Sequence, residues 1–339
     1  MRKTFRALPI LVAFLLAAVF GATTAGAATV RTLNPHLMSQ HTDWLGQVDA
    51  TTLAYGARTP GSGIQVLVDG TGTPRAVAAP DGPRGCAGSA AGSGHLLFTC
   101  ALGFTNANES RRLVVTAPDG TVQKSFDSTL PNAPVDGAPP GLPDAIGAQW
   151  IHHESGCYHF NSWSVDVNWQ TGETRNPTTS ALLSNDQDLD AADLLSPLCA
   201  PITQNAPPPG DTESWPQTLG VQRYGQWVLQ GIVVQGPNAA ERGWQLRHCG
   251  TTKVYKMPTG TRPVALAGGF VVLLRRASRD PRRASMQLLR LSDRRVFRVG
   301  GSWPSFDGGK AFAATGHRLL IRGDATSGGS LWSVILPQR

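Results

Sequence analysis

Gly269-Phe270-Val271-Val272-Leu273-Leu274, Ser285-Met286-Gln287-Leu288-Leu289-Arg290-Leu291 and Arg294-Arg295-Val296-Phe297-Arg298-Val299 are three apolar runs inside residues 262–299. Each run has the length and the β-branched or aromatic content of a β-strand. An Asp-Pro pair lies between the first two runs, and Ser292-Asp293 lies between the last two; these residue types favour turns. The stretch therefore predicts three consecutive antiparallel strands.

The same unit recurs along the chain, marked by a glycine that precedes an apolar strand, with further strands after it. A tight polar turn, such as Asp69-Gly70 or Asp119-Gly120, joins later strands of several copies. Each copy predicts a small antiparallel sheet of three or four strands, which cannot bury both of its faces alone. The copies begin at Gly94, Gly147, Gly225, Gly269 and Gly316, and a copy without the glycine begins at Thr52.

The composition agrees with many short strands joined by turns. The chain has 339 residues with 38 glycines and 25 prolines, and only 16% of its residues are charged against 41% that are hydrophobic. Long amphipathic helices would need more charge and fewer helix breakers. The whole sequence therefore predicts an all-β protein.

The repeats carry a resemblance to a known architecture. Gly94-His95 and Gly316-His317 open strands, and Trp244 and Trp332 begin the strands that follow. This pattern resembles the WD40-like β-propellers, and it looks like exported bacterial propellers of unassigned function. No Trp-Asp dipeptide occurs, so these are not true WD40 repeats. The resemblance covers most of residues 28–339, implies one β-propeller domain, and carries over no functional residue.

Six copies predict six blades, although the spacing leaves a second possibility. The interval between Gly147 and Gly225 is longer than the others, so residues 180–215 are either an insertion or a seventh blade. The last copy ends at residues 335–337 without an outermost strand, and residues 28–33 could supply it. That pairing would close the ring and remove an exposed edge. An open two-sheet sandwich is the alternative.

The N-terminus predicts export. Arg2, Lys3 and Arg6 precede an apolar run over residues 8–20, and Ala25-Gly26-Ala27 offers a signal-peptidase site. Residues 1–27 are therefore predicted to be a signal peptide, which places the mature protein outside the cytoplasmic membrane, secreted or in the cell envelope. No later segment is apolar and long enough to predict a membrane span. Without the three basic residues of the leader, the formal charge falls from +7 to +4.

Five cysteines are compatible with disulfides in an exported protein. Cys86 and Cys100 flank one predicted hairpin, so we expect them to pair. Cys157 and Cys199 are the next plausible pair, which would leave Cys249 over. In the alternative, Cys249 is paired and another cysteine is free.

Two groups of side chains could hold a metal ion, and neither has a complete motif. His152 and Glu154 would share one face of a strand, with His153 on the other face, and His159 follows nearby. We expect this group to be a polar hairpin. Another group lies in an acidic loop, which lacks the glycine and the final acid of an EF-hand. Its weak candidates are Asp186, Asp188 and Asp190. No metal or other cofactor is predicted.

Tryptophan and arginine side chains are further candidates for binding groups. Nine tryptophans could include a sugar-stacking platform, but several occupy equivalent strand positions, which favours packing between blades. Trp215 and Trp303, beside prolines, are better placed for exposure. The excess positive charge is concentrated in residues 262–298. It could bind an anionic polymer, although a solvated turn and arginines that protect an edge strand explain it more simply.

The sequence has no nucleophile motif and no Cys-x-x-Cys. Two functions remain. The first is a monomeric, non-catalytic propeller outside the membrane that binds a protein or a glycan on one rim, and nucleic acid is not expected as a partner. The alternative is a hydrolase or lyase of an extracellular polymer, with a site built from several loops. The first is the expectation.

Overall fold

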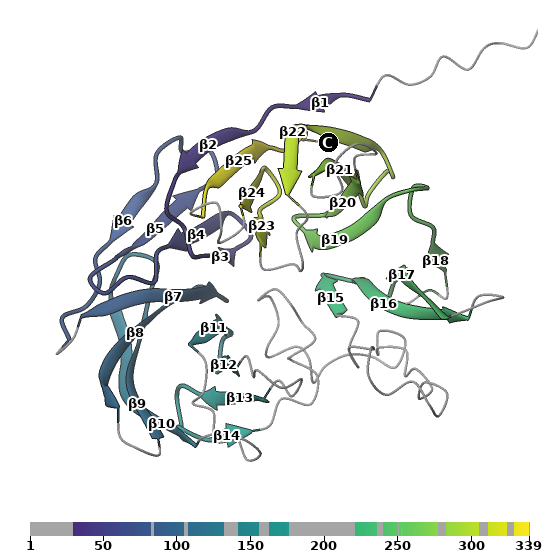
Figure 1. Ribbon diagram of the computed structural model, residues 1–339. Helices are drawn as coiled ribbons and strands as arrows, with labels where there is room; N and C mark the ends of the chain where they lie inside the picture. Colours follow the sequence, from purple (N-terminus) through teal and green to yellow (C-terminus); the bar gives the residue numbers. More distant parts are fainter. Residues whose placement is uncertain are drawn as a thin grey trace, which may run out of the picture. The chain divides into compact units, whose positions relative to one another are not determined.

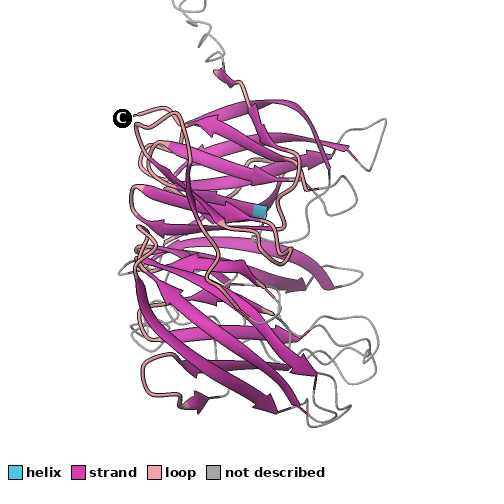
Figure 2. Ribbon diagram, turned by 90° about the vertical axis from the view of Figure 1, so that its left-hand side faces the viewer, coloured by secondary structure: helices cyan, strands magenta, loops and turns pink. Residues whose placement is uncertain are grey.

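The computed structural model describes residues 30–82, 85–104, 108–131, 142–155, 163–175, 221–235, 240–249, 251, 253–276, 283–304, 311–323 and 329–338. Their regular structure is almost entirely β-strand (Figure 2), which confirms the all-β prediction. In this part of the chain, no helix has the length and apolar character needed to cross a lipid bilayer.

Six small sheets follow one another along the chain (Figure 1). In the first three, each strand pairs antiparallel with the next. The first consists of β3 (Trp44–Asp49), β4 (Thr52–Gly56), β5 (Ile64–Val68) and β6 (Arg75–Val77); the second of β7 (Cys86–Gly92), β8 (His95–Phe104), β9 (Asn108–Thr116) and β10 (Val122–Pro131); the third of β11 (Pro143–Ile146), β12 (Trp150–Ser155), β13 (Trp163–Asn168) and β14 (Thr174–Arg175).

The remaining sheets follow the same rule, and the last two also include strands from the N-terminal end. The fourth consists of β15 (Val221–Tyr224), β16 (Trp227–Gln235), β17 (Ala240–His248) and β18 (Val254–Tyr255); the fifth of β19 (Arg262–Ala267), β20 (Phe270–Arg276), β21 (Arg283–Arg290), β22 (Val296–Pro304) and β1 (Thr32–Leu33); the sixth of β23 (Phe312–Ala314), β24 (Arg318–Arg322), β25 (Leu331–Ile335) and β2 (His36–Ser39).

Each predicted copy corresponds to one of these sheets. The three runs between residues 269 and 299 are β20, β21 and β22, and a strand that the prediction lacked, β19, precedes them. The turns between the third and fourth strands are tight: Gly70, Gly120 and Gly172 have φ angles of 80°, 96° and 82°. Such angles favour glycine. In the fifth sheet the corresponding turn uses Arg294, at a φ of 64°.

Apolar clusters join the sheets face to face. One cluster joins the first and second sheets, another the second and third, another the fourth and fifth, and the largest joins the fifth and sixth. A further cluster joins the sixth sheet to the first, where Leu53, Tyr55 and Leu67 pack with Ala313, Leu320 and Leu331. The first strands of neighbouring sheets also contact one another, as β3 does with β7 and with β23. These are the contacts of blades in a β-propeller.

The N-terminal segment joins two sheets, and the predicted partner was wrong in detail. The missing fourth strand of the last sheet is β2, where His36 pairs with Ser333 and Leu37 with Trp332. Residues 28–33 do not fill that place, because Thr32 and Leu33 pair in parallel with β22 of the fifth sheet. The segment thus adds a strand to each of two consecutive sheets.

One predicted disulfide is present, and another prediction has to be revised. Cys86 and Cys100 are directly opposite on β7 and β8 and are disulfide-bonded, with a Cα–Cα distance of 4.0 Å. Cys249 is also disulfide-bonded, so the expectation that it is left over was wrong. Cys157 and Cys199 lie outside the described residues, as does the predicted insertion at 180–215.

Leu33 gives a test of the N-terminal strand's contribution. Its side chain is 6% exposed and belongs to the largest cluster, so we expect Leu33→Ala to lower the free energy of unfolding by about 2–3 kcal/mol. Urea unfolding followed by circular dichroism measures this. Val30→Ala, at a residue 52% exposed, is the matched control and should have no effect. Equal stability of both variants would show that β1 contributes nothing to the fold.

Candidate binding site

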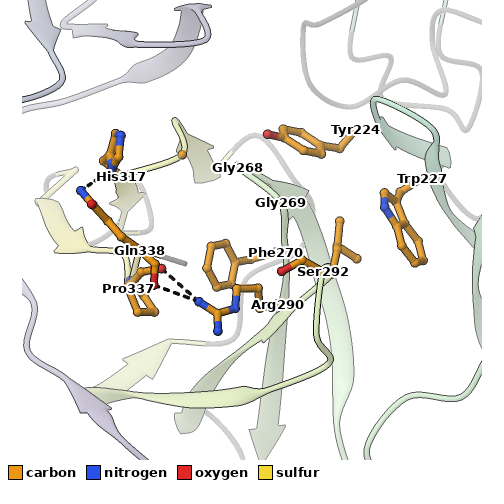
Figure 3. A pocket seen from close by; sticks show the side chains of 12 residues that line it. Tyr224, Trp227, Gly268, Gly269, Phe270, Arg290, Ser292, His317, Pro337 and Gln338 are labelled. Atoms are coloured by element: carbon orange, nitrogen blue, oxygen red, sulfur yellow. Dashed lines mark hydrogen bonds between the residues drawn. The ribbon is translucent and has the colours of Figure 1, made fainter.

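A pocket of about 500 Å³ opens where turns of the fourth, fifth and sixth sheets meet (Figure 3). Each turn joins the first and second strands of its sheet: Gly225-Gln226 in the fourth, Gly268-Gly269 in the fifth and residues 315–317 in the sixth. Two of the glycines that marked the repeat in the sequence, Gly269 and Gly316, therefore lie at this pocket. Its lining includes Tyr224, Trp227, Phe270, Arg290, His317 and Gln338.

Glycine is required at the base of the pocket. Gly268 and Gly269 have φ angles of 57° and 81°. A Cβ atom at Gly268 would collide with the carbonyl oxygen of Thr315 in the sixth sheet. The absence of a side chain therefore lets the fifth and sixth sheets approach closely below the site.

Aromatic side chains from two sheets form the walls. Trp227 is half-buried, and its ring meets His248 edge to face at 4.9 Å and Tyr255 at 5.1 Å. Phe270 is buried and packs edge to face against Phe297 at 6.3 Å. These contacts hold the rings in place before any ligand arrives, as a pre-formed site requires.

The polar side of the pocket comes from the sixth sheet and the C-terminal segment. The Nε2 amide of Gln338 donates a hydrogen bond of 2.9 Å to Nδ1 of His317 (Figure 3). Because Nδ1 accepts this bond, the neutral ring carries its proton on Nε2. His317 is exposed, so it offers one N–H donor at the pocket.

Arg290 fixes the C-terminal segment as a wall. Its Nε and Nη2 atoms donate to the two carboxylate oxygens of Asp293 at 2.9 and 2.5 Å. Its Nη1 atom donates to the carbonyl oxygens of Pro337 and Gln338, each at 3.3 Å (Figure 3). The hydrogen bonds from Arg290 are the main reason that the pKa of Asp293 is lowered to about 2. The guanidinium charge is thus already balanced by a carboxylate.

The chemistry of the lining restricts the ligand. No Asp or Glu is among the lining residues that the structure describes, and Asp293 compensates the arginine. A cationic ligand would find no partner. Aromatic walls, one imidazole N–H and an amide instead suit an uncharged ligand with apolar faces and hydroxyl groups. The volume lies within the usual range for small-molecule sites.

The histidine group predicted as a weak metal site has another structure. His152 and Asp166 are directly opposite on β12 and β13, and His152 Nδ1 lies 2.7 Å from Asp166 Oδ1. Arg175 donates from Nε to the other carboxylate oxygen at 3.1 Å, and its guanidinium lies 3.9 Å from the centre of the Trp150 ring. Asp166 is fully buried and His152 nearly so. The three residues therefore connect β12, β13 and β14 inside the third sheet.

The other metal candidates remain predictions. His153 lies on the opposite face from His152, as the strand alternation predicted. Both histidines are buried, so the expectation that they lie on the surface of a polar hairpin was wrong. The side chain of Glu154 is not among those described, and His159, Asp186, Asp188 and Asp190 lie outside the described residues. Within the part of the chain that the structure does describe, no three His, Cys, Asp or Glu side chains come together as a metal site would need.

The tryptophans were assigned partly wrongly. Trp303, chosen from the sequence for exposure, is only 5% exposed; its Nε1 atom donates to the carbonyl oxygen of Gly300 at 3.1 Å, and its ring packs against Trp332. Trp227 packs between the fourth and fifth sheets, as the repeat positions of the tryptophans predicted, and it also lines the pocket. Trp215 lies outside the described residues. Sequence reasoning did not select Tyr224, whose place directly before the marker glycine was the available signal.

No protein-family model and no curated protein matches this chain. Among solved structures, it is similar to the AtxE2 isopeptidase at 10% identity and a TM-score of 0.38, over 86% of this chain and 49% of that one. TolB from Acinetobacter baumannii is 12% identical at a TM-score of 0.35, over 85% and 64%. The β-propeller domain of the trilobed protease from Pyrococcus furiosus is 8% identical at 0.34, over 83% and 78%. The chain thus spans about half of the isopeptidase and less than two thirds of TolB.

The Asp293 carboxylate gives a prediction of pH dependence. Its folded pKa of about 2 is below the usual value of about 3.9, so the stabilisation by its pair with Arg290 is complete above about pH 4 and is lost as the pH falls towards 2. We expect the ¹³C carboxyl shift of Asp293 to titrate with a midpoint near pH 2. Asp293→Asn should abolish that signal and release the C-terminal segment. A titration midpoint near pH 3.9 would show that Arg290 does not lower the pKa of Asp293.

Proposed function

We propose that this chain is an exported, non-catalytic β-propeller that binds a neutral glycan in the pocket between its fourth, fifth and sixth sheets. The observation that carries the proposal is the lining itself: pre-positioned aromatic rings, a histidine N–H and an amide, with no carboxylate among the described lining residues. Sugar rings have apolar C–H faces that stack on aromatic side chains and hydroxyl groups that bond to polar ones. A concave pocket of about 500 Å³ has the size of a small-molecule site, which favours a glycan over a protein ligand.

The proposed architecture is a closed ring of six blades. It is supported by the apolar clusters that join the first three sheets in order, by those that join the fourth to the fifth and the fifth to the sixth, and by the packing of the sixth sheet against the first. The pairing of β2 with β25 supports closure by an N-terminal strand. WD40-like β-propellers of the exported kind remain the family that the sequence resembles.

The hydrolase or lyase alternative has less support. It would place His152, His153 or the acidic loop near the channel. His152 is directed at Asp166, whose second oxygen is already occupied by Arg175, and both residues are buried. A general acid or base has to reach its substrate.

Architecture and export can be tested on one sample. We expect the exported protein to begin at Ala28 by mass spectrometry and to show six sheets in a crystal structure, with β2 as the outermost strand of the last. A further sheet within residues 176–220 would overturn the blade count. An intact leader on the exported protein would overturn the predicted processing.

The binding proposal predicts that Trp227→Ala weakens glycan binding about tenfold or more, because one stacking wall is lost. A glycan array with the wild-type protein would identify the best neutral oligosaccharide, and calorimetry would give its affinity for each variant. Trp332→Ala is the matched control, since Trp332 is also half-buried but does not line the pocket.

Two results would count against this site. An equal loss of glycan affinity in Trp227→Ala and Trp332→Ala would indicate a general effect on the fold. If no oligosaccharide on the array binds the wild-type protein, the proposal of a glycan ligand is refuted. His317→Ala, at an exposed residue, provides a second variant with little risk to folding.

A further inference from the structure

Three arginines lie on one face of the fifth sheet. Along β21, exposure alternates, so Arg283, Ser285 and Gln287 share a face while the residues between them are buried. Arg275 on β20 is directly opposite Ser285, and Arg298 on β22 is directly opposite Gln287. Directly opposite residues point to the same side of a sheet, so these residues form one surface, called here the arginine face.

The arginine face is not explained by protection of a sheet edge. The strand order is β1-β22-β21-β20-β19, so β20, β21 and β22 all have neighbours on both sides. An edge-protecting arginine would lie on an outer strand. Protection of an edge strand therefore does not explain Arg275, Arg283 and Arg298.

These arginines also lack acidic partners. All three are exposed, and none forms an ion pair with a carboxylate in the described part of the chain. The one described acid of the fifth sheet, Asp293, is held by Arg290 and Arg295. Arg283 does donate a hydrogen bond of 3.3 Å to the carbonyl oxygen of Ser302. No acidic side chain among the described residues therefore balances the charge of these three arginines, and an anionic ligand would supply that balance.

We propose that the arginine face binds an acidic polysaccharide. Strands lie about 4.8 Å apart and alternate residues on one strand about 7 Å apart, so the guanidinium groups form a flat array that can follow a chain of repeated anions. Arginine binds carboxylate and sulfate-like groups through paired N–H donors. Ser285 and Gln287, between the arginines, offer hydrogen bonds to sugar hydroxyl groups.

The composition of the face distinguishes this ligand from other polyanions. Single-stranded nucleic acid is normally bound on aromatic side chains that stack with bases, and the array formed by these five residues has none. Attachment to a membrane surface combines basic residues with apolar side chains that insert, and these are also missing from it. The face lies at the other end of the sheet from the pocket, because Phe270 pairs with Arg290 whereas Arg276 pairs with Ala284.

The test uses heparin and polygalacturonate as sulfated and carboxylated probes, and dextran as the neutral probe. We expect the wild-type protein to bind the two acidic probes and not dextran, with affinity falling as salt is raised. The variant Arg275→Gln/Arg283→Gln/Arg298→Gln should lose at least tenfold in affinity and elute from immobilised heparin at lower salt. Thermal unfolding should be unchanged, since all three side chains are exposed.

The control variant Arg58→Gln/Lys124→Gln/Lys253→Gln removes the same net charge from exposed sites on other sheets. It should bind as the wild-type protein does. An equal loss of affinity in both variants would show that binding depends only on the overall charge, and this would overturn the proposal. Equally tight binding of single-stranded DNA or of vesicles with anionic lipids would overturn the polysaccharide assignment.

This proposal stands apart from the pocket. Trp227→Ala should bind heparin as the wild-type protein does, and the triple arginine variant should keep its affinity for a neutral oligosaccharide. Either site can therefore fail without the other. A variant of one site that abolished both activities would contradict their independence.

Discussion

A sheet of four strands has two faces and cannot cover either of them alone, and the rest of this structure follows from that constraint. Strands such as β4 and β19 show little alternation of apolar and polar residues, because both faces of these strands are buried against neighbouring sheets. Each apolar cluster consequently draws its members from two sheets. Loss of one sheet would expose apolar faces on the sheets beside it, so the repeats form one cooperative unit.

The same constraint decides where a site can form. The faces of the sheets are used for packing, whereas the turns at their ends are left to vary. At one end of the fifth sheet, Gly268 permits a close approach that brings His317 and Trp227 to a common pocket. At the other end, the same sheet exposes Arg275, Arg283 and Arg298. One sheet thus contributes to two proposed sites with different chemistry.

Much of the fold could be predicted from the sequence, because its signals are local. A glycine with positive φ and a run of apolar residues each depend on a few neighbours, and Gly70, Gly120 and Gly172 behaved as predicted. Residues 28–33 were predicted to pair with the last sheet, and β2 at residues 36–39 was not predicted at all, because a short strand pattern does not specify its partner; the packing of Leu33 in the largest cluster does. The pocket could not be predicted, since Tyr224, Phe270 and His317 belong to three repeats and nothing local relates them. The same holds for Trp303, whose burial depends on Trp332.

The position of β1 and β2 has a consequence for the order in which the molecule can be completed. These strands are among the first to leave the ribosome, yet their partners in β22 and β25 are among the last. The fifth and sixth sheets therefore stay incomplete until almost the whole chain has been made, and closing so long a loop is slow.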